Sequence, residues 1–340
     1  MINKKTTVIF LTLIILIVIT VGIGYFSFFQ KGDKTKNTET TKQELFGCLD
    51  EGKAVSYKIE EKESPLADVI IFVNDKFTEK ELSYFKIENI RKNYHPIEIH
   101  RCGIYVIRMF NYDPLDPKQG KDYRAELWRY AYDGSKEMQL LFDGFSTDFR
   151  VDPTESYVAL EWSYLDNQDY ALVIKDLKTK KNSFVLKFVD FIKQYPGFSG
   201  NFGLYGGWST NGQYFWGQIF DGANVLEFLR IEREIWKMSV FPTPPNVLGG
   251  DALNTDTGWL TVHSDNVWYG DTEFTEQEKA KRRAQGVGTE LYIYNLFTGK
   301  RYFVDKIDEP LWFFKPQWFS DTELEYELPN GDKKVYNINL

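Results

Sequence analysis

A strand–turn–strand unit recurs along this sequence, and this repetition constrains the possible fold more than any other feature. Each copy has an aromatic or polar strand, a turn rich in Asp or Asn-Gly, and a second, strongly aromatic strand. The copies are Ile97–Val106, Phe149–Leu160, Gly207–Trp216, Ala252–Leu260 and Pro316–Tyr326. The matching residue after the turn in the five successive copies is Tyr105, Tyr157, Tyr214, Trp259 and Leu324. Successive copies are therefore 52, 57, 45 and 65 positions apart.

A second unit follows each copy, an alternating apolar strand that runs into a polar turn. Its copies are Leu127–Lys136, Leu172–Lys181, a looser Phe228–Ile231, Leu291–Lys300 and a truncated Val335–Leu340. Aromatic residues make up 17% of the chain, and most of them fall on these recurring strands. Repeats of about 40–60 residues with four strands each are typical of β-propeller blades.

Two features resemble the TolB-like and WD40-like β-propeller repeat family. One is a strand such as Leu127–Phe142, and the other is the kind of turn that follows such strands, seen in Trp208-Ser-Thr-Asn-Gly-Gln-Tyr214. They are also similar to the propeller half of the dipeptidyl-peptidase and prolyl-oligopeptidase group. The resemblance covers 149–340, and 97–148 more loosely, and implies an all-β propeller of four-stranded blades. Five repeat units can be counted in the sequence, while the family more often has six blades, so we expect five or six. Those peptidases carry a nucleophile on a G-x-S-x-G elbow, which this sequence does not contain.

We divide the globular part into an addition over 46–96 and a propeller over 97–340. The strand Ala54–Ile59 is expected to complete the last blade, because a closed propeller hides its edges. The strand Asp68–Val73 is followed by Thr78–Tyr94, which we interpret as a helix that ends before Pro96. Its apolar residues have roughly helical spacing: Leu82, Phe85, Ile87 and Ile90.

The segment Val8–Phe29 has 22 residues without a charge. As a helix it would span about 33 Å, which is enough to cross a bilayer. We therefore expect a membrane anchor over 1–30 and a polar linker over 31–45. Lysines flank the segment on both sides and do not decide its orientation, but the short N-terminal tail favours a single-pass protein with its C-terminal domain at the cell surface or in the periplasm.

The charge balance disfavours a nucleic-acid partner. Six of the 41 basic and three of the 49 acidic residues lie in 1–45, so 46–340 holds 35 basic and 46 acidic residues. Phosphate binding needs a clustered basic surface. The one basic cluster, Lys279–Arg283, follows three glutamates and is interpreted as a solvated helix face.

Neither the cysteines nor the histidines suggest a catalytic or metal site. Cys48 and Cys102 lack a metal-motif partner and are disulfide candidates if the domain is exported, the alternative being two buried thiols. We expect no metal and no cofactor, and no catalytic role for His95, His100 or His263. The segment Asn254–Trp259 resembles a degenerate Asp-box of sialidase-like propellers.

Blade-to-blade loops and the loops between second and third strands should emerge on one common face. They span 111–122, 143–148, 164–169, 188–206, 221–224, 242–251 and 264–288. On this face a candidate binding surface of rings and carboxylates comprises Tyr195, Phe198, Phe202, Tyr205, Trp268, Tyr269, Asp113, Asp148, Asp166, Asp221 and Asp271. The alternative is that these aspartates form turns and the rings cover blade edges.

These features favour a membrane-anchored, exported, non-catalytic binding or protein-interaction module of the cell envelope. Its partner would be a protein, a peptide or a glycan, besides the bilayer around residues 8–29. The alternatives are a surface hydrolase that acts on glycans or peptides through carboxylates of the same face, and a purely structural module.

Overall fold

The computed structural model describes residues 48–61, 66–91, 97–110, 124–134, 137–141, 145–163, 170–194, 201–221, 224–244, 252–264 and 272–338. The predicted anchor and linker lie outside these residues. Within the described ranges, no helix is long and apolar enough to cross a membrane. The chain forms two compact units, and their described parts are 48–194 and 201–338.

The first unit consists of antiparallel meanders, in which each strand pairs with the next along the chain. The first is β1 (Lys53–Glu61), β2 (Leu66–Asp75) and β3 (Glu81–Arg91). The second is β4 (Ile97–His100), β5 (Gly103–Phe110), β6 (Arg124–Tyr130) and β7 (Glu137–Leu141), joined to the first by the pair Ile90 and Arg108. The third is β8 (Phe145–Val151), β9 (Tyr157–Ser163), β10 (Tyr170–Asp176) and β11 (Asn182–Lys187), followed by α2 (Phe188–Gln194).

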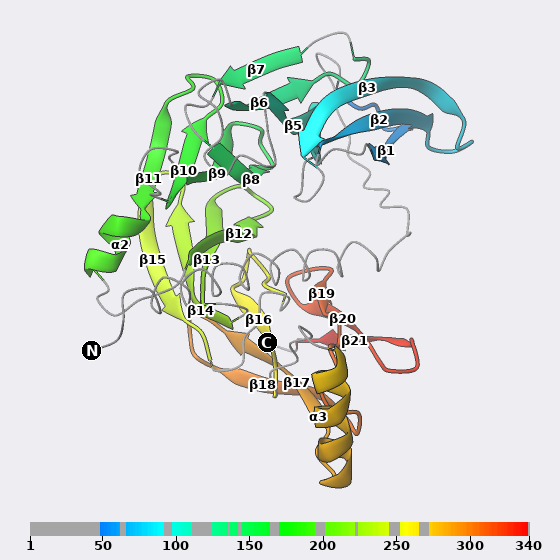
Figure 1. Cartoon of the computed structure of the whole chain (residues 1–340), viewed down its shortest axis with the longest axis vertical. Coiled ribbons are helices and arrows are strands. Elements are labelled where there is room, and N and C mark those ends of the chain that lie inside the picture. The colour runs from blue at the N-terminus through cyan, green and yellow to red at the C-terminus, as the bar shows by residue number, and fades with distance from the viewer. Residues whose placement is uncertain are drawn as a thin grey trace, which may run out of the picture. The chain divides into compact units, whose positions relative to one another are not determined.

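The second unit holds three further meanders. They are β12 (Asn201–Trp208), β13 (Tyr214–Asp221), β14 (Asn224–Glu232) and β15 (Lys237–Pro242); then β16 (Trp259–His263), β17 (Thr289–Asn295) and β18 (Arg301–Ile307); and last β19 (Gln317–Trp318), β20 (Glu323–Glu327) and β21 (Lys333–Asn337). An isolated bridge between Leu253 and Leu260 stands where a first strand would precede β16. The helix α3 (Thr272–Ala284) lies between β16 and β17 in the sequence (Figure 1).

The expected all-β class is confirmed, since the described residues are mostly strands with two short helices. Each copy of the strand–turn–strand unit lies at the start of one meander, over the turn that precedes its strongly aromatic strand. The basic cluster lies in α3, where Lys279 and Arg282 pair with Glu276 and Glu278 at 3.3 and 2.9 Å. The cluster thus lies on a helix, as predicted, with Lys281 and Arg283 exposed and Lys279 and Arg282 less so.

The helix predicted over 78–94 is wrong, because residues Glu81–Arg91 form β3. Ala67 pairs with Ile90 and Val69 with Ile87, so β3 carries one extra residue between these pairs. Asn89 has a φ of 62°, and its N–H lies 3.4 Å from Asp68 Oδ1. This β-bulge turns Ile87 and Ile90 to the same buried face, which produces a three-residue spacing that imitates a helix.

One other expectation about the chain's segments needs correction. Residues 188–206 were predicted as one loop, yet α2 occupies Phe188–Gln194 and β12 begins at Asn201. The strand expected around Ala54–Ile59 exists as β1, which pairs with β2 along its whole length. Its completion of the last blade stays a prediction.

Each unit has its own apolar core. In the first unit Val69, Ile71 and Ile87 pack under the β1–β3 sheet, and Phe149 and Leu160 lie between the meanders that follow. In the second unit Trp216 and Phe228 are fully buried and meet edge to face, with ring centroids 6.4 Å apart. Many of the aromatic residues are therefore part of the packing of the sheets.

Candidate functional site

The first turn of the β8–β11 meander is organised by one buried carboxylate, Asp152. Its Oδ1 accepts the backbone N–H groups of Ser156 and Tyr157 at 2.7 and 2.5 Å. Its Oδ2 accepts the backbone N–H of Thr154 at 3.1 Å and also the Thr154 hydroxyl. A short polar side chain that caps backbone donors in this way fixes a tight turn.

The same position is filled by other polar residues in the second unit. Ser209 Oγ accepts the N–H of Tyr214 at 2.9 Å and donates to Asn211 Oδ1 at 2.8 Å. Asn254 Oδ1 accepts the N–H groups of Asp256 and Thr257, each at 3.1 Å. The sequence similarity of the repeats thus reflects a shared turn geometry.

In the second unit these first turns are tied to one another. Asp256 accepts the backbone N–H of Thr210 at 2.9 Å and, through its other oxygen, the Thr210 hydroxyl. Asn254 Nδ2 donates to the carbonyl of Ser320 at 3.0 Å, and Thr255 Oγ1 donates to that of Trp208 at 3.1 Å. Three successive meanders are therefore linked through side chains at the same end of their strands.

An open groove of about 840 Å³ lies across these three turns. We call it the turn groove. Its lining residues are Thr210, Asn211, Tyr214, Leu253, Asn254, Thr255, Asp256, Trp318, Phe319, Ser320 and Asp321.

The turn groove offers a ring and a carboxylate that are not used within the fold. The side chain of Phe319 is 58% exposed. Asp321 is exposed, and its carboxylate makes no hydrogen bond or ion pair among the described residues. None of the eleven lining residues is basic. The groove can therefore stack against an apolar or cationic group and accept hydrogen bonds, but it does not favour an anion.

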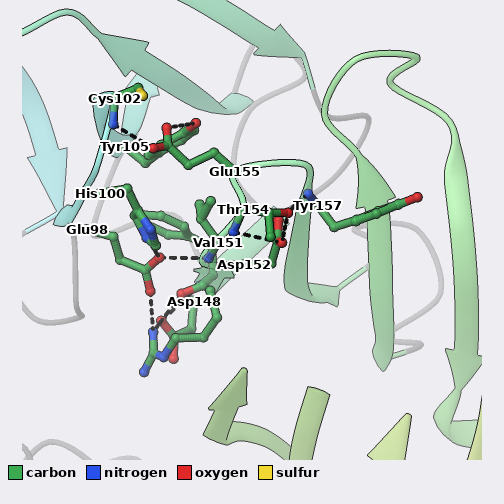
Figure 2. Close-up of polar contacts among 12 residues, drawn as sticks. Glu98, His100, Cys102, Tyr105, Asp148, Val151, Asp152, Thr154, Glu155 and Tyr157 are labelled. Atoms are coloured by element: carbon green, nitrogen blue, oxygen red, sulfur yellow. Dashed lines mark hydrogen bonds and ion pairs between the residues drawn. The ribbon is translucent and has the colours of Figure 1, made fainter. Parts of the chain in front are cut away.

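A second polar cluster lies in the first unit, around Glu155 (Figure 2). Glu155 has a φ of 53°, and its carboxylate accepts the N–H of Cys102 at 2.6 Å and the hydroxyl of Tyr105 at 2.9 Å. Arg129 lies 3.5 Å from the same carboxylate and donates to the Cys102 carbonyl at 2.9 Å. Burial, and then the charge of Glu155, raise the pKa of Tyr105 well above its ordinary value of 10.0. Tyr105 is therefore a neutral hydrogen-bond donor here.

Glu98 continues this cluster toward β8 (Figure 2). Its Oε2 accepts the N–H of Val151 at 2.7 Å and lies 3.0 Å from His100 Nε2. Arg150 lies 3.7 Å from Glu98 and donates to Asp148 Oδ1 at 2.7 Å. These polar groups bond one another and tie the β4–β5 turn to β8 and the β8–β9 turn, so we interpret the cluster as a latch within the first unit.

The structure describes few of the predicted site residues. Those outside the described residues are Tyr195, Phe198, Trp268, Tyr269, Asp113, Asp166 and Asp271. Phe202 and Tyr205 lie in β12, and Asp221 ends β13. For these three residues the structure describes only the backbone. Asp148 is buried in the latch, and Cys48 is joined to Cys102 by a disulfide.

The turn groove was not predicted from the sequence. Its residues lie in the turns that define the repeats, and we treated those turns as structural only. The one available signal was Trp318-Phe-Ser-Asp321, in which two rings and a carboxylate stand in a single short turn.

Histidines and metal ligands supply no alternative site within the described ranges. His263 is buried, and its Nε2 accepts the N–H of Phe314 at 3.3 Å. His95 lies outside the described residues. In the part of the chain that the structure describes, no group of three His, Cys, Asp or Glu residues could hold a metal ion.

No protein-family model matches this chain, and no curated protein sequence matches it. Similar solved structures include the β-propeller domain of the Trilobed protease from Pyrococcus furiosus, with 10% identity over 85% of this chain and 79% of that one and a TM-score of 0.48. A prolyl endopeptidase structure is 11% identical over 84% of this chain and 37% of that one, with a TM-score of 0.47.

Cobalt-substituted Synechocystis apocarotenoid oxygenase is 12% identical over 76% of this chain, with a TM-score of 0.41. The chain spans 59% of the length of that oxygenase. With every one of these TM-scores below 0.5, the similarities assign neither a family nor an activity to the chain.

Proposed function

We propose that this chain is a membrane-anchored β-propeller whose globular part lies outside the cytoplasm and binds a partner through the turn groove. Five consecutive antiparallel meanders, β4–β7 to β19–β21, support the propeller, because strands that pair in chain order are typical of blades; the first three have four strands each and the last two have three. The uncharged segment Val8–Phe29 supports the anchor. The disulfide between Cys48 and Cys102 supports an oxidising compartment.

The observation that carries the binding function is the turn groove itself. Its walls are cross-linked by hydrogen bonds between turns, while Phe319 and Asp321 face solvent. A concave surface with a few polar groups and a ring is the usual form of a ligand site. The partner is a peptide or protein segment, or a neutral glycan, and an anionic ligand is disfavoured by Asp256 and Asp321.

A double variant tests the groove. In the full-length protein, Phe319→Ala with Asp321→Asn should lower the signal on peptide and glycan arrays severalfold, because it removes both exposed groups without touching a hydrogen bond of the turns. The matched control is Phe303→Ala with Asp308→Asn, which alters an exposed ring and an exposed carboxylate outside the groove. Equal loss in both variants, or no loss in either, would overturn this assignment.

A second experiment tests the location. When protease is added to spheroplasts, in which the outer layers are open and the inner membrane is intact, the globular part should be cut as fast as in lysed cells. If spheroplasts protect it while lysed cells do not, the domain is inside and the exported orientation is wrong.

The hydrolase alternative is favoured by one observation, two carboxylates in one groove. It predicts that the full-length protein cleaves a glycan or peptide substrate and that Asp321→Asn abolishes cleavage. Binding without turnover by the wild-type protein would exclude it for that ligand.

A further inference from the structure

Three exposed apolar side chains of the first unit lie in the turn between β2 and β3 or in the first residues of β3. Phe77 is 81% exposed, Tyr84 68% and Leu82 49%. Tyr84 also lies beside Phe72, with ring centroids 6.5 Å apart. We call the turn over 76–80, together with Leu82 and Tyr84, the hairpin tip. Large apolar side chains exposed so close together in the chain are candidates for a contact with another surface.

The hairpin tip is held in shape by Asp75. Its Oδ1 accepts the N–H groups of Phe77 and Thr78 at 3.0 and 2.8 Å and the Thr78 hydroxyl at 2.9 Å. The bonds from Thr78, the backbone one first, lower the pKa of Asp75 below 3.8, so the carboxylate stays ionised. The turn thus presents the Phe77 ring to solvent from a fixed backbone.

The tip lies beside the point where the chain enters the unit. Lys76 donates its N–H to the carbonyl of Gly52 at 2.7 Å, and a Cβ placed on Gly52 would lie 3.7 Å from the Phe77 ring. Leu49 donates to Arg101 at 3.3 Å, and Cys48 is bonded to Cys102. Residues 48–53 are therefore fixed to the same end of the sheet as Phe77.

A short segment connects this end to the predicted anchor. Only residues 30–47 lie between Phe29 and Cys48. Such a segment reaches at most about 60 Å in any conformation. The end of the unit that bears the hairpin tip is thus the end tethered to the bilayer.

From this placement we propose that the hairpin tip contacts the surface of the bilayer that holds the anchor, with Phe77, Leu82 and Tyr84 at headgroup level. This inference rests on the anchor of the proposed function. Aromatic side chains favour the membrane–water interface. Lys76 and Lys80 can extend their charges toward water while their stems lie along the rings.

The charges around the tip determine which lipid it suits. Lys53 is paired with Asp50 at 2.8 Å. Glu51, Glu79 and Glu81 add negative charge beside Lys76 and Lys80. Electrostatic attraction to anionic lipid is therefore absent, and the contact depends on the rings with a zwitterionic surface such as phosphatidylcholine.

Spin labelling of the full-length protein in phosphatidylcholine vesicles tests the contact. A nitroxide is attached to Phe77→Cys or, as a control in another turn of the same unit, to Lys178→Cys. The native cysteines are joined to each other and do not react. Collision rates with oxygen and with a water-soluble nickel chelate are measured by power saturation. We expect the oxygen-to-nickel ratio at position 77 to exceed that at position 178 severalfold.

Further measurements test this interpretation. Adding Leu82→Ser and Tyr84→Ser to Phe77→Cys should lower the oxygen-to-nickel ratio toward that of Lys178→Cys without shifting the thermal unfolding midpoint. Including anionic phosphatidylglycerol in the vesicles should not raise the ratio at position 77. A label at 77 that is as accessible to nickel as that at 178, in protein that resists alkaline extraction from the vesicles, overturns the inference alone. A label shielded equally in detergent indicates a protein contact and also overturns it. Extraction of the protein by alkali refutes the anchor and, with it, this inference.

Discussion

At the scale of single residues, the first turns depend on one capping side chain each. Asp152 is fully buried and accepts three backbone N–H groups. Asn254 caps an equivalent turn with an amide oxygen, so a charge is not required. The geometry needs a short side chain with an acceptor, and the sequence could predict that much from Asp, Ser and Asn at these positions.

Replacing Asp152 should therefore destabilise the first unit in a graded way. We expect Asp152→Ala to lower the free energy of unfolding by about 2–4 kcal/mol, since it leaves buried N–H groups without an acceptor. Asp152→Asn should lose less, because one oxygen remains. Urea denaturation measures both variants. Asp321→Ala, at an exposed turn position, is the control and should change the free energy by less than about 0.5 kcal/mol.

A second residue-scale prediction concerns acid. Burial alone would raise the pKa of Asp305, but hydrogen bonds from Lys334 Nζ at 2.8 Å and Tyr326 OH at 2.9 Å outweigh it and hold the pKa below 3.8. The folded state thus favours the ionised form, and its stabilising effect is present above the unfolded pKa and lost as the pH falls through the folded pKa.

Asp305→Asn should accordingly be less stable than the wild-type protein near neutral pH by about 1 kcal/mol. The difference should shrink from about pH 4 downward. Thermal unfolding followed across pH 2–7 measures this. A constant difference over the whole range would show that Asp305 does not contribute through its charge.

At the scale of elements, short irregularities limited what the sequence could predict. The recurring strands and turns were predictable because their alternation repeats along the chain. The bulge at Asn89 was not, since a single extra residue changes the apolar spacing from two to three and imitates a helix. The turn groove could not be predicted either, because no local sequence pattern shows that Thr210 and Asp256, in different meanders, are hydrogen-bonded to each other.

Another irregularity, in β12, leads to a prediction. The register between β12 and β13 shifts between Gly203 and Gly207, and a Cβ placed on Gly206 would lie 2.5 Å from the Trp216 carbonyl oxygen. Gly206→Ala should therefore cost about 1–3 kcal/mol, because backbone must move. Gly52→Ala is the matched control, since its Cβ would meet Phe77 at an ordinary 3.7 Å. An unfolding midpoint of the second unit that Gly206→Ala leaves at its wild-type value would contradict this account.

At the scale of the whole molecule, the two compact units each have their own core. The meander architecture was predictable from the repeats. The pairing of β1 with β2 was not, because the strand pattern of Ala54–Ile59 does not show which strand lies beside it. Pairing with the next strand along the chain closes a short loop and costs little entropy.

The disulfide should therefore stabilise one unit and not the other. Cys48 and Cys102 are separated by 54 positions in the first unit. Replacing both by Ser should lower the free energy of unfolding of that unit by about 4 kcal/mol on the chain-entropy estimate. Calorimetry with and without reductant measures this. The second unit's transition should stay in place, and the double Ser variant should not respond to reductant.

The hydrogen bonds between the first turns of the second unit also bear on the kinetics of binding. Because Asp256 and Asn254 fix neighbouring turns to one another, a ligand meets walls that do not have to rearrange. Association should then be a single concentration-dependent step, without a slow phase, and ligands of one class should differ mainly in how long they stay bound. Thr210→Val removes the hydrogen bond from the Thr210 hydroxyl to Asp256. It should introduce a slower second phase in stopped-flow binding traces, even though Phe319 and Asp321 remain exposed in the groove.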